Sequence, residues 1–134
     1  MKMLFIGGAG NICSEAVRDF VKTSNFNRIT IGDINMDAAK KLMDELDDDR
    51  VDIRKVDVFN KEEAVSIIRE YDVVAGGTDG SISGQVVGCI AEAGVPGLNL
   101  SGMMIDDSLG HNQMLKDKGL PVIVGCGMTP GVTN

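Results

Sequence analysis

The chain has few of the residues that mark membrane, secreted or metal-binding proteins. Its 134 residues include no Trp, one His and three Cys, and aromatic residues make up 4%. No apolar run reaches the roughly 18 residues of a membrane-spanning helix, and the apolar stretch near the N-terminus is too short for a secretory signal. The cysteines, odd in number, lack metal-ligand spacing and indicate free thiols in a reducing compartment. We therefore expect a cytoplasmic protein with no membrane segment and no metal site.

Positive charge is also scarce. Lys and Arg number 13 against 20 Asp and Glu, which gives a net charge of −7 and a pI of about 4.6. This balance argues against nucleic acid and anionic membranes as partners. With 43% hydrophobic residues, the chain can bury the core of a single domain.

Short apolar runs alternate with segments of helical periodicity along the whole chain. We predict strands at Met3–Ile6, Arg28–Ile31, Asp52–Val56, Asp72–Ala75, Gly97–Leu100 and Pro121–Val124. Strands that alternate with helices favour right-handed crossovers and a parallel sheet covered on both faces. The pattern predicts an α/β doubly wound (Rossmann) fold with six strands in the order 3-2-1-4-5-6.

Four segments between these strands have clear helical signals. Asn35 is the expected N-cap of a helix carrying the stripe Met36, Ala39, Met43 and Leu46, and Asn60 with Glu63 is the expected capping box of a helix over Lys61–Glu70. Two further helices are predicted over Ser81–Gly94 and Asp107–Gly119, each ending at a glycine. His111, the single histidine, is expected to be a structural residue within the last of these.

A glycine-rich turn directly follows the first predicted strand. Gly8, Ala9, Gly10, Asn11 and Ile12 lead to Cys13, which occupies the third glycine position of the G-x-G-x-x-G fingerprint. Glycine lets the backbone turn sharply and approach a pyrophosphate, and the start of the next helix offers free N–H groups to the phosphate charge. Asp33, at the end of the second strand, is placed to accept hydrogen bonds from the adenine ribose hydroxyls. The order of these parts predicts a dinucleotide site.

In a parallel sheet of this order, ligands bind beyond the carboxyl ends of the strands. The residues that follow each strand are therefore the candidate contacts. They are Gly8, Ala9, Gly10, Asn11 and Ile12 at the pyrophosphate, Asp33 and Ile34 at the ribose, Asp57 and Val58 at the adenine, and Gly76, Gly77, Thr78 and Ser101 toward the nicotinamide. Catalytic residues are not identifiable from the sequence.

The choice of cofactor follows from charge. A 2′-phosphate beside Asp33 would bring two anions together in a partly buried site, and no Lys or Arg follows until Lys40. We therefore predict NAD rather than NADP.

The closing segment, residues 125–134, reads Gly-Cys-Gly-Met-Thr-Pro-Gly-Val-Thr-Asn. It resembles the G-x-x-P-G-x-x-N segment of the saccharopine dehydrogenase-like reductases, a family that includes saccharopine reductases, lysine 6-dehydrogenases and carboxynorspermidine dehydrogenases. The start of the chain, the pair Asp57 and Val58, and residues 72–77 also look like this family. The resemblance implies an N-terminal dinucleotide-binding domain, residues 1–134, of a longer oxidoreductase with a separate substrate and dimerisation domain.

The implied reaction is hydride transfer between a nicotinamide and the carbon of a small amino-acid-like substrate or its imine. A homodimer is one expected assembly. Thr129-Pro130 reads as a helix start, so we expect the chain to be a fragment that is inactive by itself. Cys126 is a candidate for lining the substrate site.

Two other classes share parts of this pattern. A nucleotide-sensing regulatory Rossmann module has the same glycine turn and acid but needs no catalytic domain. A methyltransferase that binds S-adenosylmethionine also uses an acid after the second strand, but it adds an antiparallel seventh strand, which nothing after Asn134 supplies.

Overall fold

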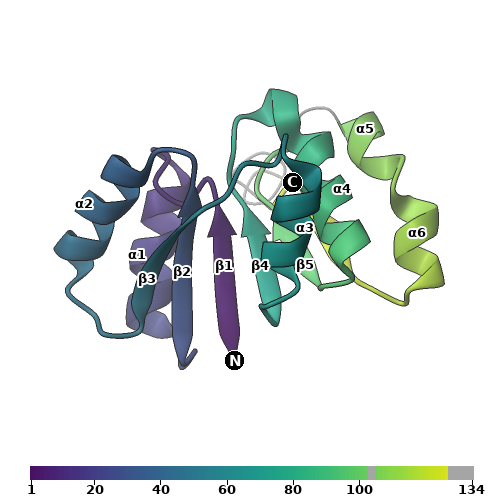
Figure 1. Ribbon diagram of the computed structural model, residues 1–134. Helices are drawn as coiled ribbons and strands as arrows, with labels where there is room; N and C mark the ends of the chain where they lie inside the picture. Colours follow the sequence, from purple (N-terminus) through teal and green to yellow (C-terminus); the bar gives the residue numbers. More distant parts are fainter. Residues whose placement is uncertain (103–104, 127–134) are drawn as a thin grey trace.

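The computed structural model describes residues 1–102 and 105–126, which form a six-stranded sheet (Figure 1). The strands are β1 (Lys2–Ile6), β2 (Arg28–Asp33), β3 (Val51–Lys55), β4 (Val73–Gly76), β5 (Gly97–Asn99) and β6 (Val122–Val124). Their order is β3-β2-β1-β4-β5-β6, and each neighbouring pair is parallel. The predicted fold class and strand order are confirmed, and each strand lies within two residues of its expected bounds.

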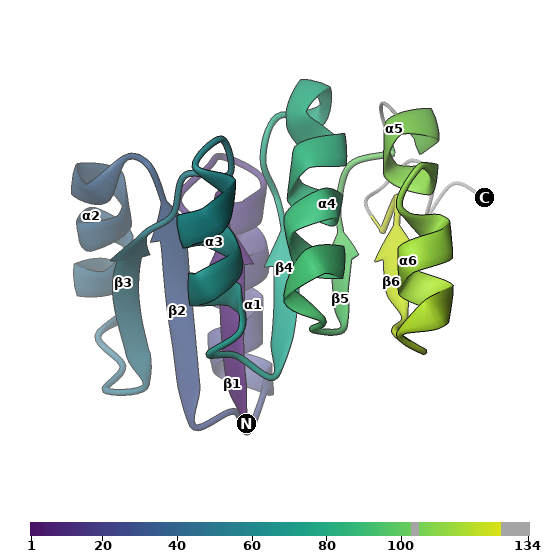
Figure 2. The ribbon, with the colours of Figure 1, turned by 45° about the vertical axis from the view of Figure 1, so that its right-hand side comes forward.

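Helices cover both faces of this sheet. They are α1 (Cys13–Thr23), α2 (Met36–Leu46), α3 (Lys61–Ile68), the 3₁₀ turn η1 (Gly80–Ile82), α4 (Ser83–Ala93), α5 (Ile105–Leu109) and α6 (Asn112–Asp117). Figure 2 shows α3, α4 and α6 in front of the sheet and α1 behind it. Among the residues that the structure describes, no helix combines the length and apolarity that crossing a bilayer requires.

Each face of the sheet has its own apolar core. Leu4, Ile6 and Val74 pack toward α3 and α4, whereas Phe5, Ile29 and Ile31 pack toward α1 and α2. The alternation along β1 places successive side chains on opposite faces, and both faces are covered. This explains why the central strands β1 and β4 are largely apolar, whereas the edge strand β3 carries Asp52, Arg54 and Lys55.

The two predicted Asn caps differ in the structure. The Asn35 side chain accepts a hydrogen bond from the Ala38 amide at 3.1 Å and so caps α2 as expected. The Asn60 side chain makes no hydrogen bond to the backbone of α3 and instead donates to the Glu63 carboxylate at 2.7 Å. The predicted capping box at Asn60 was therefore wrong, because the Glu63 carboxylate binds the Asn60 side chain and the Asn60 backbone amide donates to the Asp57 carbonyl oxygen at 3.1 Å.

The single helix predicted over residues 107–119 was also wrong, because the segment forms α5 and α6 with a break at Gly110. Glycine disfavours a helix interior. Residues on either side of the break contact the two glycines of α4. Asp107 lies against Gly84, and the imidazole of His111 lies against Gly88, where a Cβ would be 2.9 Å from Nε2. His111 is half-buried and lies at the N-cap of α6 rather than within a helix.

Arg50 joins the start of β3 to the end of α1. Its guanidinium donates to the carbonyl oxygens of Val21 at 2.6 Å and Ser24 at 2.9 Å. It also forms an ion pair with Asp48, with 2.7 Å between Nη2 and Oδ2. This hydrogen bond and a second one from the Arg50 amide lower the pKa of the Asp48 carboxyl to about 2. The charge of Asp48 therefore holds Arg50 in its capping position.

This ion pair predicts a pH-dependent contribution to stability. Because the pKa of Asp48 is depressed in the folded state, its contribution is complete above the unfolded value and is lost as the pH falls from about 4 to about 2. We expect Asp48→Asn to lower the urea midpoint at pH 7 and to match the wild type near pH 2. A difference in midpoint that stays constant from pH 7 to pH 2 would contradict this.

Candidate functional site at the carboxyl ends of the strands

The turn after β1 lies tightly against the end of β2. Gly7 has a φ of +71°, a left-handed conformation that favours glycine. The amides of Gly7 and Gly8 both donate to the Gly32 carbonyl oxygen, at 2.8 and 3.1 Å. A Cβ on Gly7 would lie 2.9 Å from the Thr78 side chain, so the turn also touches the segment that follows β4. The backbone is therefore fixed between two neighbouring strand ends.

Asp33 closes β2 with its carboxylate facing this turn. One carboxylate oxygen accepts a hydrogen bond from the Ala9 amide at 3.0 Å, and the other accepts from the Asn35 amide at 2.9 Å. A carboxylate oxygen has more than one lone pair, so each can still accept a hydroxyl group. The structure thus places Asp33 beside the glycine turn, as the sequence predicted.

The start of α1 carries free backbone donors. In the described part of the chain, the amides of Asn11, Ile12 and Cys13 have no hydrogen-bond acceptor, and α1 has no side-chain cap. Unpaired amides at a helix start, with the positive end of the helix dipole, form an anion-binding arrangement.

A cavity of about 300 Å³ opens beside these elements. It lies where the chain order of the strands reverses, between β1 and β4, which is the ligand position expected for such a sheet. Seven of the predicted site residues line it, namely Gly10, Asp33, Ile34, Asp57, Val58, Gly77 and Thr78.

The other predicted residues are close in the chain but do not line this cavity. Gly8, Ala9, Asn11 and Ile12 form the turn and the start of α1 around it. Gly76 packs against Val86 and Asn99, whose atoms a Cβ would meet at 2.6 and 2.9 Å. Ser101 lies after β5, where its carbonyl accepts from the Gly125 amide at 3.2 Å.

Several lining residues were not predicted, and they are Ile6, Gly7, Val56, Phe59, Asp79 and Ile82. Phe59 is the most informative of them, because this aromatic side chain is 67% exposed. Its amide donates to the Asp57 carboxylate at 2.9 Å, which fixes the turn after β3. Ile34, which also lines the cavity, is equally exposed, at 67%. The sequence signal that could have identified Phe59 is its position directly after the predicted residues Asp57 and Val58.

The charged side chains that line this cavity are all acidic. They are Asp33, Asp57 and Asp79, and neither Lys nor Arg is among the described residues of the lining. Asp79 is held at the start of η1, where its carboxylate accepts from the amide and hydroxyl of Ser81 and its pKa is lowered by these bonds. The cavity therefore favours a neutral, hydroxyl-bearing group and disfavours an additional anion.

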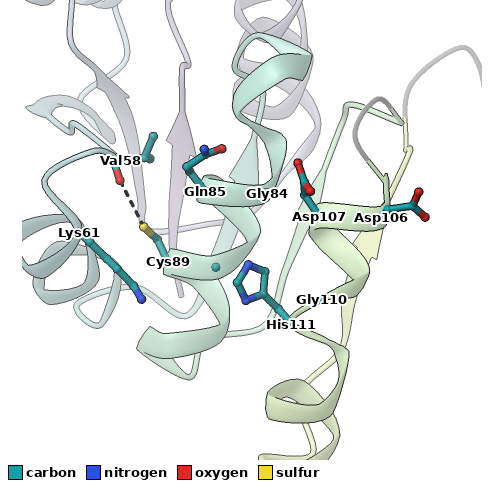
Figure 3. Close-up of a pocket in the computed structure, with 10 residues that line it drawn as sticks. Val58, Lys61, Gly84, Gln85, Cys89, Asp106, Asp107, Gly110 and His111 are labelled. Carbon is teal, nitrogen blue, oxygen red and sulfur yellow. Dashed lines mark hydrogen bonds between the residues drawn. The ribbon is translucent and has the colours of Figure 1, made fainter.

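A larger cavity, of about 540 Å³, lies between α3, α4 and α5 (Figure 3). Val58 is the one predicted site residue in its lining. In Figure 3 the Cys89 thiol points toward the Val58 carbonyl, at 3.7 Å, and the His111 imidazole faces α4. The larger cavity is lined mainly by residues of α3, α4 and α5, whereas the smaller one is lined by residues at the carboxyl ends of β1 to β4 and includes seven predicted site residues, so the smaller cavity is the candidate functional site.

Comparison with known families agrees with this geometry. Residues 3–120 match the family described as the saccharopine dehydrogenase NADP binding domain. The chain belongs to this family. The resemblance stated from the sequence is therefore confirmed, and the chain is an NAD(P)-binding domain of the saccharopine dehydrogenase type.

Solved structures share the fold over almost the whole chain. Apo saccharopine dehydrogenase (L-Glu forming) from Saccharomyces cerevisiae has a TM-score of 0.83 at 16% identity, covering 98% of this chain and 28% of that one. UDP-N-acetylglucosamine 3-dehydrogenase GnnA from Acidithiobacillus ferrooxidans has a TM-score of 0.70 at 20% identity, covering 93% and 36%. A Veillonella parvula short-chain dehydrogenase/reductase in complex with NADP has a TM-score of 0.63 at 13% identity, covering 92% and 67%.

The solved structures share the fold of this chain, but the chain matches only part of each of these longer enzymes. The chain spans 28% of the yeast enzyme and 36% of GnnA, and identities this low show a common fold rather than a common substrate. The family description names NADP, so the predicted preference for NAD has no support from it. The closing motif from Gly127 to Asn134, on which the resemblance first rested, lies outside the described residues.

The three cysteines have different environments. Cys13 is fully buried, and burial, together with the charge of Asp33, raises the pKa of its thiol to about 12. Burial also raises the pKa of the Cys89 thiol. Cys126 is exposed after β6, with its amide donating to the Asn99 carbonyl oxygen at 3.2 Å.

This difference predicts selective thiol chemistry. Because the thiolate is the reactive form and only Cys126 is exposed, we expect a maleimide at pH 7.5 to label Cys126 in the native protein. Cys13 and Cys89 should react only after addition of denaturant. The measurement is mass spectrometry of tryptic peptides after timed labelling, with Cys126→Ser as the control. Rapid native labelling of Cys13 would contradict the buried position.

Proposed function

We propose that this chain is the NAD-binding domain of an oxidoreductase that transfers hydride between the nicotinamide and a carbon bonded to nitrogen in an amino-acid-like substrate. The observation that carries the proposal is the Asp33 carboxylate, held 3.0 Å from the Ala9 amide at the rim of the cavity. An acid at the end of β2 beside a glycine turn is the arrangement that recognises ribose hydroxyls.

Each part of the site then has one binding task. The free amides of Asn11, Ile12 and Cys13 receive the pyrophosphate, and Asp33 accepts from the ribose hydroxyls. The apolar side chains of Ile34, Val58 and Phe59 contact the adenine, with Asp57 as acceptor for its amino group. Gly76, Gly77, Thr78 and Ser101 lie toward the nicotinamide half. The cavity lining supports the roles of seven of these residues, and the family assignment supports the dinucleotide; the seven are Asp33, Ile34, Asp57, Val58, Phe59, Gly77 and Thr78.

The bound nicotinamide supplies the hydride chemistry, and the residues of this chain supply binding and orientation. The proposed substrate class follows from the family name and from the fold shared with the yeast saccharopine dehydrogenase. Residues that handle protons and recognise the substrate are proposed to lie in the part of the parent enzyme that this chain does not match.

The preference for NAD is part of the proposal and rests on electrostatics. A 2′-phosphate would lie beside Asp33 in a cavity that Asp57 and Asp79 also line. Two like charges about 4 Å apart repel each other by roughly 1–4 kcal/mol between the dielectric of water and that of a protein surface. An unphosphorylated ribose instead donates hydrogen bonds from two hydroxyl groups to the carboxylate.

Calorimetric titration with NAD and NADP tests this assignment. We expect NAD to bind at least tenfold more tightly than NADP. Asp33→Ala should weaken NAD binding by about 10- to 100-fold, since a hydrogen bond to a charged group contributes about 1.5–3 kcal/mol. Asp33→Asn keeps one oxygen acceptor, so its affinity for NAD should lie between that of the wild type and that of Asp33→Ala.

The matched control is Asp19→Ala, which removes an exposed carboxylate from α1 outside the cavity and should leave both affinities unchanged. Tighter binding of NADP than of NAD by the wild type would overturn the charge argument while leaving the family assignment in place. Binding of neither dinucleotide would overturn the proposed function.

The adenine contact gives a second prediction. Phe59→Ala should weaken NAD binding by about 3- to 10-fold, because an aromatic stack adds about 0.5–1.5 kcal/mol beyond area burial. Its thermal stability should stay unchanged, since the side chain is 67% exposed. Nicotinamide mononucleotide, which lacks adenine, should bind the wild type and Phe59→Ala with equal affinity. Leu109→Ala, which removes another exposed apolar side chain, is the control and should leave NAD affinity unchanged. An unchanged affinity for NAD would remove Phe59 from the site.

A further inference from the structure

Cys13 and Gly77 are in direct contact beside the candidate site. A Cβ built on Gly77 would overlap the Sγ of Cys13 and would lie 2.5 Å from its Cβ. Cys13 is fully buried, so its side chain has no open space into which to turn away. The thiol therefore fills the volume that a side chain at position 77 would need.

This pair explains how the chain departs from the dinucleotide fingerprint. The third fingerprint glycine normally lets the helix pack closely against the sheet. Here that position is Cys13, at the first turn of α1, and the glycine that makes room stands opposite it after β4. Gly77 has no left-handed φ, so its backbone accommodates any residue, and the obstacle to a side chain is steric.

The pair also sits directly at the site. Gly77 lines the cavity, and its amide donates to the Ile6 carbonyl oxygen at 2.8 Å. Cys13 carries one of the free amides at the start of α1. The combined volume at positions 13 and 77 thus sets the separation between those amides and the segment after β4. With a pKa near 12, the Cys13 thiol stays neutral at physiological pH and adds no negative charge beside an anion.

We propose that Cys13 and Gly77 form a coupled positioning pair that sets the geometry of pyrophosphate binding. The space between the two positions holds one small side chain, which Cys13 supplies. The proposal rests on the proposed dinucleotide function and goes beyond it, because it assigns the departure from the fingerprint a compensating partner on another element. Moving the side chain from position 13 to position 77 should preserve binding, whereas filling both positions should weaken it at least tenfold.

The test is a double-mutant cycle of Gly77→Ala, Cys13→Gly and the combination of the two, measured by titration with NAD and by thermal unfolding. We expect Gly77→Ala to lower NAD affinity at least tenfold and to lower Tm by several degrees. The combined variant should return to within about threefold of the wild-type affinity, since the next nearest atom to a residue 77 Cβ, after those of Cys13, is the flexible end of Leu100 at 3.3 Å. Val21→Ala, which removes buried apolar volume from the last turn of α1, is the control and should lower Tm without changing NAD affinity.

A positioning role and a purely structural role differ in which ligands are affected. In Gly77→Ala, affinity for ADP-ribose should fall at least fivefold more than affinity for adenosine, measured by NMR titration, because only the former carries the pyrophosphate. An equal loss for both ligands would overturn the positioning role. If Gly77→Ala fails to fold, soluble expression and NAD binding by the combined variant still support the pair, and failure of the combined variant to bind overturns it.

The outcomes separate this inference from the proposed function. Wild-type binding of NAD together with additive effects in the cycle overturns the pair and leaves the function standing. Absence of dinucleotide binding by the wild type overturns the function and this role with it.

Discussion

The attachment of the glycine turn to the end of β2 is the constraint on which the candidate site depends. Two amides, of Gly7 and Gly8, share the Gly32 carbonyl oxygen, and the next amide, of Ala9, donates to the Asp33 carboxylate. These bonds fix where the chain enters α1. The free amides at the helix start, the acid and the cavity therefore have fixed positions relative to one another before any ligand binds, which reduces the cost of ordering on binding.

Charge is divided between two sides of the site. Backbone amides and the helix dipole give the start of α1 a positive character, although no cationic side chain is found among the described residues of the cavity lining. Three carboxylates give the other side a negative character. A dinucleotide with a charged pyrophosphate and an uncharged ribose matches this division. Membership of a family named for NADP and a lining of this charge together make the cofactor preference the most informative property to measure.

Much of the fold followed from local patterns. The central strands β1 and β4 are covered on both faces and were visible as short apolar runs, and the other strands followed from their alternation with helices. The break at Gly110 was not visible, because helical periodicity continues through it. The Asn60 capping box failed because sequence spacing does not set side-chain conformation: the Asn60 side chain donates to the Glu63 carboxylate and makes no hydrogen bond to the backbone of α3.

The sequence by itself determined the strand order, the glycine turn and the position of Asp33, because these depend on residue type, spacing and the handedness of βαβ connections. Only the tertiary structure showed that Phe59 and Asp79 line the cavity and that Ser101 does not, because lining depends on how loops from different strands converge. It also showed that Cys13, at the third fingerprint position, packs against Gly77, which is 64 residues away in the chain. Sequence spacing cannot reveal this contact, because it depends on how α1 packs against the segment after β4.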